Sequence, residues 1–142
     1  MTQGPRPMLT FDIPGRPHGK GRPRFSRNSG RPYTPKATEN AENWVKSCAI
    51  NAWEDRPVTE SPLRVGIAVG SPIAASWPKA KKAAALDGSL RATGKPDLDN
   101  VAKLICDALN GIVWRDDSQI TELFVSKAYM TDPFTRVTIT EL

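Results

Sequence analysis

The chain alternates apolar and polar side chains in several short stretches, the first at residues 9–13. A period of two is typical of a half-buried β-strand, so this stretch predicts the first strand. Residues 63–69 alternate in the same way and predict a second strand, which a Ser-Pro pair then interrupts. Two more strands are expected at residues 122–130 and 135–142, because a Thr-Asp-Pro turn signal separates them.

Other stretches repeat their apolar residues at helical spacing. Residues 38–53 do so over several turns and predict an amphipathic helix whose tryptophans, Trp44 and Trp53, pack in the core. Residues 99–109 show the same spacing, and an Asn-Gly pair ends that helix. A short, basic helix is expected at residues 76–86, where a serine stands at the N-cap.

Strands and helices mix without a repeating βαβ unit, which favours an α+β fold with a small mixed β-sheet and flanking helices. The length of 142 residues suits one hydrophobic core, so we expect a single domain over residues 1–142. No apolar run approaches the roughly 18 residues of a membrane span, and no secretory signal stands at the start. We therefore expect a cytoplasmic protein without a membrane partner. Cys48 and Cys106 are expected to be reduced and buried, because neither has metal-ligand spacing.

Basic residues gather at the start of the chain. Residues 1–36 hold eight Lys or Arg and one Asp, a net charge of +7, whereas the rest of this +5 chain sums to −2. Residues 15–36 contain almost no apolar side chains and predict a basic, mobile loop. A solvated tail and a binding surface for a polyanion would both account for the charge.

Acidic residues gather in a second segment, residues 97–120. Asp97 and Asp99 project to one side of an extended chain, and Asp99 also opens the expected helix, where capping is an alternative role. Lys103 lies one helical turn later, so it either clamps a phosphate or forms an ion pair with Asp99. Asp107 extends the same stripe and is expected to be structural.

Capping would explain one of these carboxylates but not several. Carboxylate oxygens are the ligands that hard cations require, so Asp97, Asp99 and Asp117 would together supply a Mg²⁺ site. A bound metal polarises a phosphodiester and generates the attacking hydroxide without His or Cys. Cutting a nucleic acid needs both such a site and a basic surface. The residues alone support a metal-dependent nuclease and a non-catalytic nucleic-acid-binding module equally.

Several short motifs are more specific than the charge pattern. Asp-Leu-Asp-Asn at 97–100 and Lys103 are followed by Asp-Ala-Leu-Asn-Gly at 107–111 and Trp-Arg-Asp-Asp-Ser-Gln-Ile at 114–120. The order and spacing of these motifs resemble the central signature of the RusA family of Holliday junction resolvases. Gly-Lys-Gly-Arg-Pro-Arg-Phe at 19–25 and Tyr-Thr-Pro at 33–35 also resemble the phage and bacterial branch of that family.

The resemblance implies a homodimeric α+β endonuclease, bacterial or phage-encoded, that binds four-way DNA junctions and makes paired Mg²⁺-dependent nicks, with Mn²⁺ as a possible substitute. It puts the metal ligands at Asp97, Asp99 and Asp117, and the catalytic lysine at Lys103. Asp116 either shares the metal or hydrogen-bonds to nearby backbone. A dimer suits the substrate, because a two-fold symmetric junction needs two symmetric cuts.

The basic loop is expected to contact the DNA. Phosphate contacts are assigned to five of its basic residues, Lys20, Arg22, Arg24, Arg27 and Arg31. Phe25 either stacks at the opened crossover or packs on its own domain. Three alternatives remain: a less selective flap or fork nuclease, a non-catalytic DNA-binding accessory protein, and, least supported, an RNA-binding protein.

Overall fold

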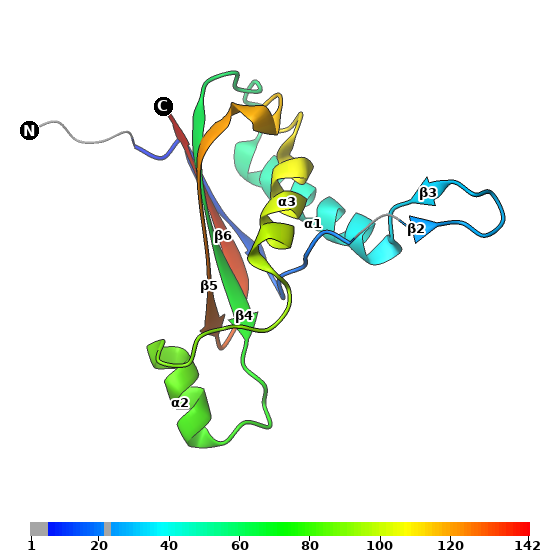
Figure 1. The fold of residues 1–142 in the computed structure, drawn as a ribbon. Helices are drawn as coiled ribbons and strands as arrows, with labels where there is room; N and C mark the ends of the chain where they lie inside the picture. The colour runs from blue at the N-terminus through cyan, green and yellow to red at the C-terminus, as the bar shows by residue number, and fades with distance from the viewer. Residues whose placement is uncertain (1–5, 22–23) are drawn as a thin grey trace, which may run out of the picture.

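A four-stranded sheet forms the centre of the computed structural model, which describes residues 6–21 and 24–142 (Figure 1). The strands lie in the order β1 (Leu9–Pro14), β6 (Phe134–Glu141), β4 (Leu63–Pro72) and β5 (Ile120–Met130). β4 pairs with β5 in parallel and with β6 in antiparallel, and β1 pairs antiparallel with β6. The predicted mixed sheet is therefore confirmed.

Helices cover one face of this sheet. α1 (Lys36–Trp53) and α3 (Leu98–Leu109) pack on each other, and α1 also packs on β1. α2 (Lys79–Asp87) contacts β5 near the end of the sheet. A short 3₁₀ helix, η1 (Asp117–Gln119), leads directly into β5. The α+β architecture with flanking helices agrees with the sequence, in which apolar residues repeat every two residues in the strands and about every 3.6 residues in the helices.

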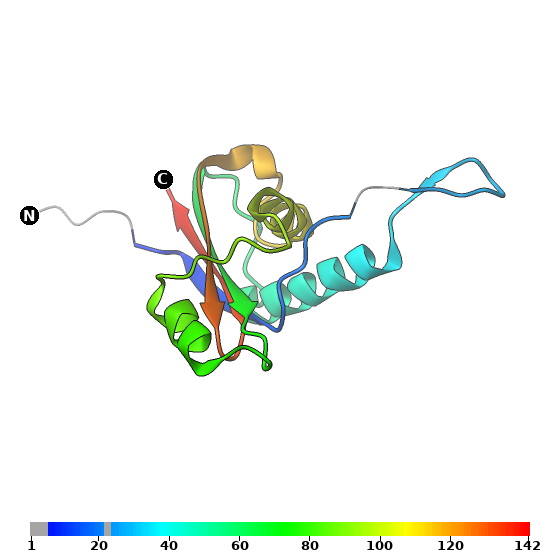
Figure 2. The same ribbon diagram turned by 60° about the horizontal axis from the view of Figure 1, so that its bottom comes forward.

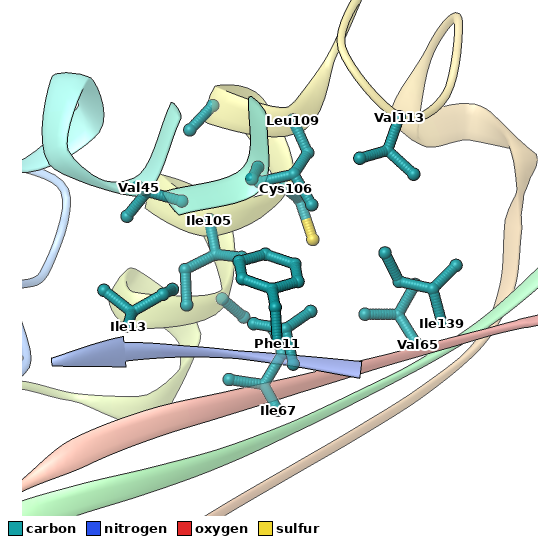
Figure 3. Close-up of a cluster of buried hydrophobic side chains, with 14 of the residues drawn as sticks. Phe11, Ile13, Val45, Val65, Ile67, Ile105, Cys106, Leu109, Val113 and Ile139 are labelled. Atoms are coloured by element: carbon teal, nitrogen blue, oxygen red, sulfur yellow. The ribbon is translucent and has the colours of Figure 1, made fainter. Parts of the chain in front are cut away.

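Alternation along the strands builds the core between the sheet and the helices. Val65 and Ile67 of β4 and Ile139 of β6 point toward α1 and α3 and are almost completely buried (Figure 3). α3 contributes Leu104 and Ile105 from its apolar face. Such period-two strands bury one set of side chains and leave the other set on the opposite face.

The opposite face of the sheet is largely polar. The guanidinium of Arg136 on β6 pairs with Asp12 on β1 at 2.8 Å, and Arg64 on β4 pairs with Glu122 on β5. Phe124, 65% exposed, is one large apolar side chain of this face. An antiparallel ladder with one solvated face explains the clean alternation in β1 and β6.

The structure corrects two predicted boundaries. The Ser-Pro pair does not interrupt β4, because buried Ser71 still pairs with Tyr129 of β5 and the strand ends at Pro72. α2 begins at Lys79, and its N-cap is Pro78, so Ser76 does not cap it. Proline fixes its own φ near the helical value and therefore starts the helix without a side-chain cap.

The two tryptophans of α1 differ. Trp53 is 3% exposed, which confirms its place in the core. Trp44 is 47% exposed, so the prediction that it packs in the core is wrong. Its indole N–H donates to the carbonyl oxygen of Pro14 at 2.9 Å, at the end of β1. Helical periodicity shows which way a side chain faces, but not where the helix passes the end of the sheet it covers.

A hairpin lies within the basic segment that was expected to be a loop. β2 (Arg24–Phe25) pairs antiparallel with β3 (Pro32–Tyr33), and the hairpin projects from the N-terminal end of α1 (Figure 1). Its tip closes with a hydrogen bond from the Ser26 N–H to the Arg31 carbonyl at 2.9 Å. Strands this short carry no periodicity, so the sequence pattern does not reveal them.

Both cysteines are free thiols. Cys106 is buried, as predicted, whereas Cys48 is half-buried, so the prediction of burial is wrong for Cys48. Within the described parts of the chain, no helix is both long and apolar enough to cross a membrane.

Packing between the sheet and the helices should dominate stability. Replacing Ile67, which is 2% exposed, with Ala should lower the free energy of unfolding by about 2–5 kcal/mol, because the core cannot close the cavity. Ile50 of α1 is 54% exposed, so Ile50→Ala is a matched control with an expected change within about 0.5 kcal/mol. Urea unfolding measures both, and equal losses would contradict the assigned core.

Candidate active site

A groove between α3 and β5 brings together three of the residues singled out in the sequence. Asp99 and Lys103 of α3 and Asp117 of η1 line it. Its apolar walls come from Ala102 and Cys106 of α3 and from Ile120 and Leu123 of β5. The groove therefore combines two carboxylates and one ammonium on a scaffold of helix and strand, although Asp117 lies beyond the end of α3 in the chain.

The amphipathic pattern of α3 aims two of these side chains outward. Val101, Leu104 and Ile105 are at most 2% exposed and hold one face of α3 in the core. Asp99 and Lys103, one turn apart, lie on the exposed face. They form no ion pair with each other. The ion-pair alternative is therefore wrong, and Lys103 is available to a phosphate.

Capping does not account for the carboxylates at the start of α3. The N-cap residue is Asp97, not Asp99, and the Asp97 side chain makes no capping hydrogen bond. The Asp97 carboxylate instead pairs with the ammonium of Lys95 at 3.1 Å and does not line the groove. The structure thus places Asp97 two residues from Asp99 but turned toward another partner.

Asp117 sits in a local concentration of negative charge. Burial raises the pKa of its carboxyl, and the charges of Asp116 and Asp107 raise it further. Burial, with Asp117 and Asp107 nearby, also raises the pKa of the Cys106 thiol to about 12. Cys106 is therefore protonated, while Asp117 occupies a position where a cation would be stabilised.

Asp116 has a different role. Its carboxylate accepts a hydrogen bond from the Ser118 N–H at 3.0 Å. Hydrogen bonds from the side chain and the backbone of Ser118 lower the pKa of this carboxyl. The Gln119 side chain accepts from the Asp116 N–H at 3.0 Å, which completes a capping box on η1. Of the two roles left open by the sequence, the hydrogen bond to nearby backbone is the one that the structure shows. This cap holds η1 and so fixes Asp117 at the groove.

The donor set fits a small hard cation. No three His, Cys, Asp or Glu side chains of residues 6–21 and 24–142 form a ready-made metal cage. Two carboxylates, Asp99 and Asp117, face the same groove. Mg²⁺ typically takes one or two carboxylates and completes its shell with water and substrate phosphate. The groove therefore suits Mg²⁺ better than a cation that needs a full set of protein ligands.

A strap formed by residues 19–21 lies against α3 beside the groove. The Lys20 N–H donates to the Asn100 carbonyl at 3.0 Å, and the Lys20 ammonium binds the carboxylate of Asp107. Glu42 of α1 pairs with the same ammonium at 3.3 Å. The hydrogen bond to Asp107 raises the pKa of Lys20, so this lysine stays charged.

The strap lies so close to the helices that a side chain has little room at Gly19 and would clash at Gly21. A Cβ on Gly19 would lie 3.0 Å from the Asn100 Cβ, and one on Gly21 would lie 2.6 Å from the Thr38 Oγ1. The Gly21 N–H donates to that same hydroxyl at 2.9 Å. The Gly-Lys-Gly motif therefore anchors the segment before the hairpin. It also confirms the structural role expected for Asp107, whose distant partner Lys20 the sequence could not identify.

The remaining candidates for DNA contact lie in the hairpin. Phe25 is 73% exposed, which rules out the alternative that it packs on its own domain. Arg27 and Arg31 are exposed and line a hollow of the hairpin together with Phe25. Arg24 begins β2, while Arg22 lies outside the described residues. Their binding to DNA stays a prediction.

Comparison with known proteins identifies the family of this chain. The family model described as Endodeoxyribonuclease RusA matches residues 14–140. An uncharacterised Bacillus subtilis protein, YqaN of strain 168, is 36% identical over 140 residues, which cover 94% of this chain and 96% of the relative. The family match spans the strap, the hairpin and every residue of the groove. The chain belongs to the RusA endodeoxyribonuclease family and is a DNA-cutting enzyme.

Proposed function

We propose that the protein resolves Holliday junctions by Mg²⁺-dependent hydrolysis of one phosphodiester in each of two symmetric strands. The observation that carries this proposal is the convergence of Asp99, Lys103 and Asp117 in one exposed groove. Membership of the RusA family supports DNA as the substrate. Branched rather than linear DNA is the part of the proposal that experiment must test.

Asp99 and Asp117 would hold the cation, with Asp97 as the third carboxylate once its ion pair with Lys95 opens. Bound Mg²⁺ supplies charge neutralisation at the phosphate and lowers the pKa of a water ligand. Mn²⁺ has similar ligand preferences and would replace it. Asp116 acts on the site through the cap of η1, which sets the position of Asp117.

Lys103 would bind a non-bridging oxygen of the scissile phosphate. It is exposed, lines the groove and has no acidic partner among the residues that the structure describes. An ammonium fixed on a helix stabilises the negative charge that grows on the phosphate during attack. Its position one turn from Asp99 keeps this cation beside the carboxylates without neutralising them.

The hairpin would bind the junction itself. Arg27 and Arg31 would contact phosphates, joined by Arg22 and Arg24, and Phe25 would stack on a base at the opened crossover. Lys20 would support this surface by anchoring the strap and would not contact DNA directly, because its ammonium already binds Asp107 and Glu42. A homodimer would present two grooves to the two-fold symmetric junction.

Loss of one groove carboxylate should abolish cutting. Asp99→Asn should lower the rate of junction cleavage in Mg²⁺ by about 100-fold or more while junction binding in EDTA persists, because the amide is a poor metal ligand. Gel analysis of a labelled four-way junction measures both. Asp132→Asn, on the exposed turn between β5 and β6, is the matched control and should cut normally.

The same assay separates the proposed function from its alternatives. Paired nicks in the junction with little cleavage of a linear duplex or a flap would support resolution. Preferential cutting of the flap would identify a less selective fork or flap nuclease. Tight binding without cleavage in Mg²⁺ or Mn²⁺ would make the protein a DNA-binding accessory.

Asp117 should oppose folding while it supports catalysis. Because the folded state raises its carboxyl pKa, the ionised form destabilises the metal-free protein at neutral pH. Asp117→Asn should therefore abolish cleavage yet raise the free energy of unfolding in EDTA. That gain should fade as the pH falls through the ordinary carboxyl range, where Asp117 is protonated in both states.

Asp116 is the matched comparison for Asp117. Asp116→Ala removes the cap of η1 and should lower the free energy of unfolding. Urea unfolding at several pH values measures both variants. An Asp117→Asn protein that is less stable than the wild type at neutral pH would contradict the charge balance inferred for the groove.

A further inference from the structure

We propose that α2 and the segment after it form a second DNA-binding surface, which holds the phosphate backbone of a junction arm several nucleotides from the cut. This inference rests on the proposed function and adds a contact that neither the groove nor the hairpin supplies. The surface, called the α2 surface below, is defined by four cations: Lys79, Lys81, Lys82 and Arg91.

The cations of the α2 surface lack acidic partners. Lys79, Lys81 and Arg91 are exposed and Lys82 is half-buried, and none of the four makes an ion pair with any residue that the structure describes. Asp87 is the one acidic residue between 76 and 95, and it accepts a hydrogen bond from the Ser89 N–H at 2.8 Å. The positive charge therefore remains available to an anion.

The demands of the fold do not explain this composition. Within α2 only Ala85 is buried, and Leu86 is 58% exposed, so the helix adds little to the core. Three of its first four residues are lysines, and no acidic residue stands in its first turn. Cations near a helix N-terminus oppose the macrodipole and cost stability. A polyanionic ligand would offset that cost.

The α2 surface is held firmly beside the sheet. The ring of Trp77, just before α2, meets the ring of Tyr129 on β5 edge to face, with centroids 5.3 Å apart. The Lys81 ammonium lies 4.0 Å from the Trp77 ring centroid. The Lys127 ammonium donates to the carbonyls of Gly94 and Pro96 at 2.6 and 3.0 Å, which fixes the segment that leads into α3.

One strand sets the spacing between the groove and the α2 surface. Leu123 lines the groove, and Tyr129, on the same face of β5, contacts Trp77. They are six residues apart, or about 20 Å at the rise of a β-strand. A DNA strand advances about 3.4 Å per nucleotide along its axis, so the contact should fall about six nucleotides from the cut.

The hairpin cannot make this contact, because it projects from the other end of the molecule. Both views place α2 and the β2–β3 hairpin on opposite sides of the helical layer (Figures 1 and 2). None of the described residues that line the groove belongs to the hairpin or to α2. A junction bound to the hairpin and the α2 surface would therefore cross the groove, which positions the scissile phosphate from two sides.

The test compares removal of charge from α2 with removal elsewhere. The test variant is the double variant Lys79→Gln/Lys82→Gln, which keeps the helix propensity of α2. The control is Lys46→Gln on α1, which removes a lysine that likewise forms no ion pair with any described residue. Junction binding in EDTA is measured over a range of salt concentrations. The double variant should bind about tenfold more weakly, and its slope of log affinity against log salt should fall by about 0.9 per lost contact. Lys46→Gln should leave both quantities unchanged.

Hydroxyl-radical footprinting locates the contact. The double variant should lose protection about six nucleotides from the nick and retain it at the crossover, while circular dichroism shows an intact helix content. If the wild type cuts junctions and the double variant keeps the wild-type footprint and salt slope, this inference alone is overturned. A wild type that binds no branched DNA would overturn the proposed function and the inference with it.

Discussion

The packing of α3 against the sheet is the constraint on which the rest of the molecule depends. Its apolar face, with Leu104 and Ile105, is buried against the core, so its other face must carry Asp99 and Lys103 outward. α3 also gives the strap its anchor, through Asn100 and Asp107. One amphipathic helix thus fixes the core, the groove and the base of the hairpin together.

The distribution of charge follows from this arrangement. Two carboxylates line the groove, where burial and two neighbouring acids raise the pKa of Asp117, whereas the cations project on the hairpin and on α2. A polyanionic substrate would neutralise the cations, and a divalent cation would neutralise the carboxylates of the groove. The site is therefore less favourable for the free protein than for its complex, which is common where function requires strain or unpaired charge.

Periodicity predicted most of the fold, because strands and long helices repeat their apolar residues at different periods. It failed where the decisive contact is not periodic: Trp44 reaches beyond the sheet, and the β2–β3 hairpin is too short for a pattern. The motifs located Asp99, Lys103 and Asp117, but not the ion pair that turns Asp97 away. They also could not foresee Lys20 binding Asp107, a contact between distant parts of the chain.

Cation binding tests the central claim most directly, namely that Asp99 and Asp117 form a metal site. Crystals of the protein soaked in Mn²⁺ should show an anomalous scattering peak in the groove, within coordination distance of both carboxylates. The same peak should be absent from crystals of Asp99→Asn. A Mn²⁺ peak at any other place, with an empty groove in the wild-type protein, would contradict the account.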